Sequence, residues 1–142
     1  MFGTSRPGAA AYRQVSVDSD ALASSPHQLV LMLYDGALQA IAAARTQLQA
    51  GDIEGKGRSI ARAIEIVGSG LSASLDQAAG GDIATNLASL YDYIVRLLVS
   101  ANIANDLTKL DEAATLLGQM RDTWVAIGPL GHLGKPSNGV PA

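Results

Sequence analysis

The segment from residue 82 to residue 106, DIATNLASLYDYIVRLLVSANIAND, constrains the fold more than any other part of the chain. Apolar residues recur in it every three or four positions, the spacing that places side chains along one side of an α-helix. The members of this first stripe are Ile83, Leu87, Leu90, Ile94, Leu97, Ala101 and Ala104. The stripe predicts a helix that packs against a core, and we expect Leu90→Asp to unfold the protein because it puts a charge there.

A second set of apolar side chains lies beside or behind the first stripe. It consists of Tyr91, Val95, Leu98 and Ile103. A monomeric helical bundle would leave some of these side chains facing water unless another chain covered them. The segment therefore predicts a protein whose surface binds helices.

Turn and capping residues divide residues 25–127 into four helices. The boundaries are Ser25-Pro26 at the first start, then Gly51-Asp52, Gly80-Gly81 and Asn105-Asp106 between helices, and Gly128-Pro129 at the final stop. We expect Asp82 to cap the third helix, and Thr108 with Asp111 to form a capping box for the fourth. Links of two to four residues make successive helices antiparallel neighbours. The prediction is an all-α, antiparallel up-down four-helix bundle.

The second and fourth predicted helices also carry apolar seams, and the two ends of the chain lack one. The second helix carries Ile53, Ile60, Ile64, Val67, Leu71 and Leu75, and the fourth carries Leu110, Ala113, Leu117, Met120, Trp124 and Ile127. Glycines at 55, 57, 68 and 70 are expected to weaken the second helix. Residues 1–24 and 128–142 have no sustained period, and the latter is rich in Gly and Pro, so we expect flexible N- and C-terminal tails.

Composition excludes several classes of protein. A net charge of -3 with ten scattered Lys and Arg residues argues against nucleic acid as a partner. No run of 18 apolar residues and no cationic leader with an apolar core occurs, so we expect neither membrane insertion nor a secretion signal. The absence of cysteine agrees with a reducing compartment. The expected location is the cytoplasm.

The chain offers little for catalysis. Its two histidines, His27 and His132, cannot assemble a metal site, and none of its three glutamates stands in a di-iron spacing. His27 follows Pro26 at a helix start, which fits poorly with a phosphotransfer domain. Asp92 and Asp35 are carboxylates that could in principle act as a general-base pair, but solvated carboxylates on helix surfaces are far commoner than catalytic ones. We expect no enzyme, no cofactor and no metal.

Three stretches of the chain, together with Trp124, resemble a known family. They are AYRQVSV at 11–17, SPHQLVLMLYDGAL at 25–38 and LDQAAGGDIATNLASLYDYIVRLLVSANIAND at 75–106, in order and spanning roughly 11 to 127. They resemble FliS, the flagellin-specific export chaperone of bacterial flagella. The resemblance implies a cytoplasmic chaperone that binds the C-terminal segment of flagellin, prevents its premature polymerisation and delivers it to the flagellar type III export gate.

This reading places the flagellin contacts on apolar residues that the core seams do not use. The candidates are Leu31, Tyr34, Ile66, Tyr91, Val95, Leu98 and Ile103, with Asn102 and Asn105 at the rim of a groove. Flagellin's C-terminal segment, disordered alone, would lay an apolar helix face into such grooves. We expect Leu98→Asp to abolish binding while the fold stays intact.

The N-terminal segment carries its own apolar cluster. Tyr12 and Val15, with Val17, are candidates for covering the empty flagellin groove or for docking to the export gate, the role that the resemblance implies. Ala9 stands where relatives can carry a larger aliphatic residue, so this chain would have a weaker anchor. A regulatory protein is a further expected partner.

The residues leave one alternative open. A non-catalytic helical adaptor, or a signalling bundle of the phosphotransfer type, would present similar grooves to some other helix. Phosphate uptake on His27 would distinguish it from a chaperone, which should bind a flagellin peptide at 1:1. The free protein is expected to be a monomer or a weak homodimer.

Overall fold

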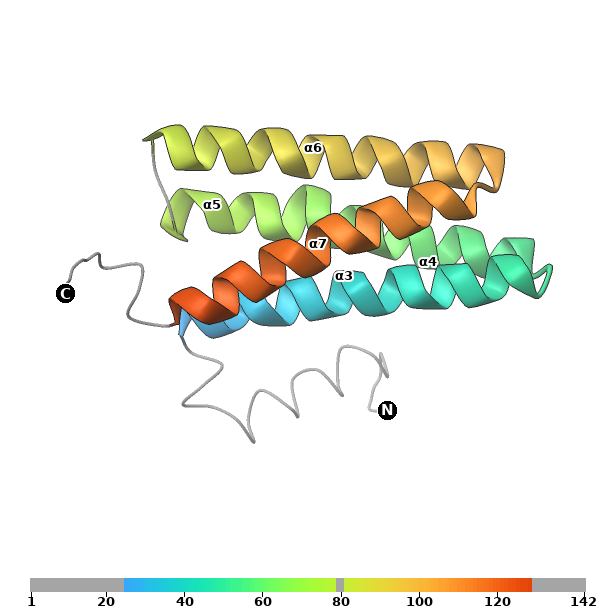
Figure 1. Ribbon diagram of the computed structural model, residues 1–142, viewed down its shortest axis with the longest axis horizontal. Coiled ribbons are helices and arrows are strands. Elements are labelled where there is room, and N and C mark those ends of the chain that lie inside the picture. The colour runs from blue at the N-terminus through green and yellow to red at the C-terminus, as the bar shows by residue number, and fades with distance from the viewer. Residues whose placement is uncertain (1–24, 79–80, 129–142) are drawn as a thin grey trace, which may run out of the picture.

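The computed structural model describes residues 25–78 and 81–128, and this part of the chain is an all-α bundle, as predicted (Figure 1). Its elements are α3 (Pro26–Gln49), α4 (Ile53–Glu65), the π-helical η1 (Ile66–Leu71), α5 (Ser72–Ala78), α6 (Gly81–Ala104) and α7 (Leu107–Ile127). The predicted tails lie outside the described residues apart from Gly128.

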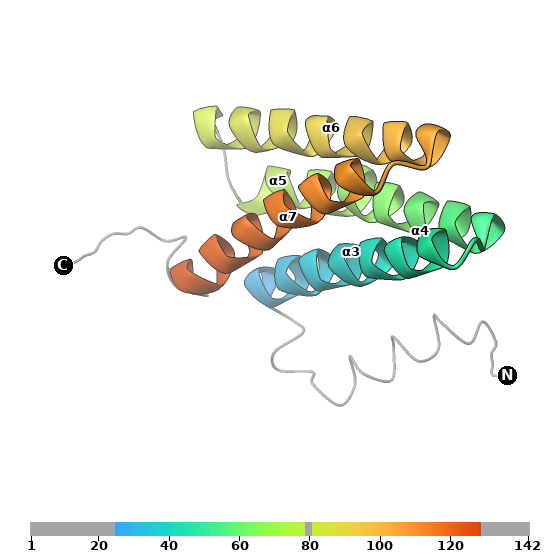
Figure 2. The same ribbon diagram turned by 45° about the vertical axis from the view of Figure 1, so that its right-hand side comes forward.

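Four rods make up the bundle, because α4, η1 and α5 follow one another without a break. In two views, α6 lies alongside this composite rod, and α7 runs obliquely from the C-terminal end of α6 to the N-terminal end of α3 (Figures 1 and 2). The largest side chains that are fully buried between the rods are Ile41, Ile60, Val67, Leu71, Ile94, Leu98, Leu110 and Leu117. Ile53 and Ile127, predicted to be core residues, are exposed because they lie at helix ends.

Side-chain caps begin three of the helices. Ser25 Oγ accepts a hydrogen bond from the backbone N–H of Gln28 at 2.9 Å, and Asp52 Oδ1 accepts one from Gly55 at 3.0 Å. The cap of α7 is Asp106, whose Oδ1 accepts from the N–H of Thr108 at 2.9 Å. The predicted capping box of Thr108 with Asp111 is therefore wrong, since the chain turns into α7 two residues earlier.

The π-helical turn explains the spacing of the second seam. Val67, Leu71 and Leu75 follow one another at intervals of four, and in a straight α-helix each such step would rotate the seam by about 40°. A π-helical turn holds an additional residue, so the seam stays on the core side, and all three side chains are buried. A Cβ at Gly70 would lie 3.1 Å from Leu33 of α3, which explains a glycine at this close approach.

A buried cation fastens the C-terminal end of α6. Lys56 of α4 is only 3% exposed, and its Nζ donates to the carbonyl oxygen of Asn102 at 2.9 Å and to Oδ1 of Asn105 at 2.6 Å. Asn105 adopts a φ of 53°, in the left-handed region that commonly ends helices. The negative end of the helix dipole, at the C-terminus of α6, also stabilises an ammonium group placed there. This end of α6 is therefore fixed to α4 by polar contacts.

Candidate binding surface

The first apolar stripe of α6 changes from buried to exposed along its length. Ile94 is fully buried and Leu97 is 8% exposed, whereas Leu90 is 38% exposed and Ile83 is 65% exposed, with Leu87 half-buried. Side chains that continue a core seam are thus left only partly covered by the described residues. We call Ile83, Leu87 and Leu90 the open seam.

The path of α7 explains why this seam is open. Among the described residues, three polar contacts join α7 to α3: Arg45 with Asp111 at 2.7 Å, Arg121 with Asp35, and a reciprocal pair between His27 and Trp124. They hold α7 against α3 while it moves away from the N-terminal half of α6 (Figures 1 and 2). The prediction that Ile83 and Leu90 lie in the core is therefore wrong, because α7, the helix that would cover them, packs against α3 instead.

The contact between His27 and Trp124 closes the end of the bundle where α3 begins and α7 ends. The Nε2–H of His27 donates to the carbonyl oxygen of Trp124 at 2.8 Å, and Nε1 of Trp124 donates to the carbonyl oxygen of His27 at 2.9 Å. The two rings stack with centroids 4.9 Å apart. Since His27 is 7% exposed and its Nε2 is engaged, it is unsuited to accept phosphate from a partner.

Three of the predicted flagellin contacts are core residues. Tyr34, Tyr91 and Leu98 are 2%, 3% and 0% exposed, so the expectation that they lie outside the core was wrong. The hydroxyls of Tyr34 and Tyr91 hydrogen-bond to each other at 2.8 Å across the bundle. Burial is the main cause that raises the pKa of both hydroxyls above the ordinary value, so both remain protonated.

The remaining predicted contacts have intermediate or high exposure. Leu31, Ile66, Val95 and Asn102 are half-buried, and Ile103 is 79% exposed. Ile66 and Val95 pack against the core, and the backbone carbonyl of Asn102 accepts from Lys56. Tyr12 and Val15 lie outside the described residues.

A second exposed apolar group lies on another side of α6. Val99 is 42% exposed and lies between Val95 and the strongly exposed Ile103 at intervals of four residues. Glycines of the neighbouring rod face the same side, since a Cβ at Gly68 would meet Val95 at 3.6 Å and one at Gly57 would meet Asn102 at 3.9 Å. The predicted second stripe of α6 is thus exposed only towards its C-terminal end.

Sequence reasoning missed the open seam as a functional surface. Its three residues carry the same spacing signal as the buried Ile94 and Leu97, so periodicity assigned them all to one core. Periodicity gives the side of a helix on which residues lie, but it does not say how far a neighbouring helix covers that side. No local signal in α6 distinguishes its two halves.

The geometry gives no support for catalysis within residues 25–78 and 81–128. No group of three His, Asp or Glu side chains that could hold a metal occurs in these ranges. Asp35 pairs with Arg121, and Asp92 pairs with Arg96 on its own helix at 2.6 Å. These two carboxylates, the only general-base candidates from the sequence, are therefore occupied in separate ion pairs.

Helix α6 is unusually apolar for a surface helix. Among the described residues it is the one helix with the length and composition of a membrane span. Only 28% of its most apolar stretch is buried. Core helices of soluble proteins pass the same test, so the informative point is how much apolar surface α6 exposes.

Together, these features define a class of protein: a helical bundle with an incompletely covered apolar seam, and with no catalytic group among residues 25–78 and 81–128. The family model for the flagellar protein FliS matches residues 8–130, and the chain belongs to this family. The flagellar secretion chaperone FliS of Salmonella typhimurium is 48% identical over 122 residues, covering 86% of this chain and 90% of the relative.

Two more relatives carry the same description. The flagellar secretion chaperone FliS of Escherichia coli is 39% identical, with 82% of this chain and 86% of the relative covered. That of Vibrio cholerae is 38% identical, with 86% and 89% covered. These similarities extend over most of both chains and support an export chaperone role for the bundle.

Proposed function

We propose that this chain is a cytoplasmic export chaperone that binds the C-terminal region of flagellin, prevents its premature polymerisation and presents it to the flagellar export gate. The observation that carries the proposal is the open seam. Ile83 and Leu90 extend a core seam into solvent, and an amphipathic helix laid along them would complete the bundle's packing. Family membership supports flagellin as the source of that helix.

The physical basis is the covering of apolar surface on both partners. A flagellin segment that becomes an amphipathic helix in a filament would expose an aggregation-prone face as a monomer. Burial on the seam removes water from both faces, at roughly 25 cal/mol per Å² of apolar area. The chaperone keeps its own fold because Ile94, Leu98 and Ala101, further along α6, stay buried within the bundle.

The half-buried and exposed residues of the other sides of α6 and α3 extend this surface. We assign Val95, Asn102 and Ile103 on α6, Leu31 on α3 and Ile66 on η1 to flanking contacts with the same client. A client of two or three short helices would reach more than one of these sides. Tyr12 and Val15 remain candidates for export-gate docking or for covering the seam when no client is bound.

Calorimetric titration with the last ~40 residues of flagellin, the length of two or three short helices, tests the proposal. We expect saturable 1:1 binding with a negative heat-capacity change and a gain of helix measured by circular dichroism. A scrambled peptide of the same composition serves as the control. If the folded chain shows no saturable heat with the native peptide, the proposed function is refuted.

A further inference from the structure

The polar contacts between helices are distributed unevenly around α6. Tyr93 and Glu112 form the one side-chain hydrogen bond that joins α6 to α7 among the described residues, from the Tyr93 hydroxyl to Oε2 of Glu112 at 2.5 Å. By contrast, α7 contacts α3 through His27, Asp35 and Arg45 along its whole length. Among the described residues, α6 is therefore joined to α7 by apolar packing and by one side-chain hydrogen bond.

That contact stands at the boundary between the fixed and the open parts of α6. Two residues before Tyr93, Tyr91 bonds to Tyr34 of α3, and at the C-terminal end of α6 Lys56 bonds to Asn102 and Asn105. Towards the N-terminus, no side chain of residues 81–90 hydrogen-bonds to another described element. The open seam ends at Leu90, three residues before Tyr93, and among the described residues the segment that carries it has only apolar side-chain contacts to other elements.

We propose that Tyr93 and Glu112 are positioning residues that set the separation of α6 from α7 and thereby hold the open seam ready for its client. The inference rests on the proposed function for its client, and on geometry alone for its effect on the free protein. A seam fixed before binding avoids the cost of ordering α6 in the complex. Loss of the contact removes one of the two hydrogen bonds, with that of Tyr91 to Tyr34, that join α6 to its described neighbours next to residues 81–90, so this segment should open locally more often.

Tyr93→Phe is the direct test, because it removes the hydroxyl and keeps the ring. Amide exchange across residues 83–90 of the free protein should accelerate several-fold, and affinity for the flagellin segment should fall about three- to tenfold, the size of one typical intramolecular hydrogen bond. Glu112→Gln should give a smaller change in both, because its amide oxygen can still accept from Tyr93.

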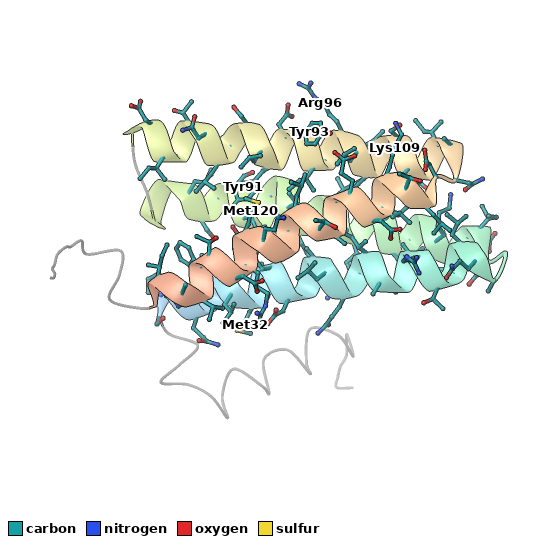
Figure 3. The ribbon with its side chains drawn as sticks, viewed as in Figure 1. Met32, Tyr91, Tyr93, Arg96, Lys109 and Met120 are labelled. Carbon is teal, nitrogen blue, oxygen red and sulfur yellow. The ribbon has the colours of Figure 1, made fainter. Side chains whose placement is uncertain are left out.

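Asp92→Asn is the matched control. The substitution removes the exposed carboxylate of Asp92, the residue before Tyr93. Asp92 pairs with Arg96 within α6, and Arg96 points away from the other helices (Figure 3). Exchange and affinity in Tyr93→Phe equal to those of Asp92→Asn, or tighter client binding by Tyr93→Phe, would overturn the inference. If the wild-type chain binds no flagellin, the proposed function fails, but the exchange comparison still decides the positioning role.

Discussion

Leu98→Asp should unfold the bundle. Leu98 is fully buried, so the substitution removes a large apolar side chain from a packed site and places a carboxylate there without a partner. The combined cost is about 4 kcal/mol or more, which is most of the stability of a typical domain. Thermal denaturation followed by circular dichroism should show no cooperative transition or one at a much lower temperature.

Val99→Asp is the control for this prediction. Val99 is the next residue on α6 and is 42% exposed, so the same charge stays in water there and the melting temperature should change little. A cooperative transition for Leu98→Asp close to that of Val99→Asp would contradict the packing described for α6. The sequence alone suggested that Leu98→Asp would spare the fold, and its burial reverses that expectation.

Leu90→Asp should leave the fold intact and weaken flagellin binding by roughly 30- to 100-fold, the effect of removing a central apolar contact. Leu90 is 38% exposed, so a carboxylate there stays hydrated in the free protein, but client binding would bury it against an apolar helix. Calorimetric titration with the flagellin segment measures the loss, and circular dichroism confirms that the variant is folded. The initial expectation that this substitution unfolds the protein is replaced by a binding defect.

Ile53→Asp provides the comparison for Leu90→Asp. Ile53 is 49% exposed, a value near that of Leu90, but it lies at the start of α4, away from the open seam. An Asp in the first turn of a helix is also well tolerated. Equal affinity of Leu90→Asp and Ile53→Asp for the client would place the binding surface elsewhere.

The helices and their order could be predicted because their signals are local. Ser25 with Pro26, and Gly51 with Asp52, mark helix ends through backbone chemistry that does not depend on the rest of the fold. The seams of the composite rod (α4, η1 and α5) and of α7 were identified from the spacing of Ile60, Val67 and Leu110, all of which are buried. The cap of α7 was assigned two residues too late, since both Asp106 and Thr108 are good capping residues.

The binding surface could be predicted only in part because exposure is a property of the whole bundle. Tyr91 and Leu90 are adjacent in sequence and both apolar, yet Tyr91 finds Tyr34 across the core and Leu90 finds no described neighbour that covers it. The difference follows the path of α7, which Arg121 with Asp35, Arg45 with Asp111, and His27 with Trp124 join to α3. Such long-range pairing leaves no trace in the periodicity of α6.

Hydrogen exchange of the chain with and without a saturating flagellin C-terminal segment tests the central claim most directly. Slower exchange across residues 81–93 in the complex, with smaller changes near Val99 and Ile103, is the result that we expect, because the client covers the open seam and suppresses its local opening. Unchanged exchange across residues 81–93 in a chain saturated with the segment would contradict the account.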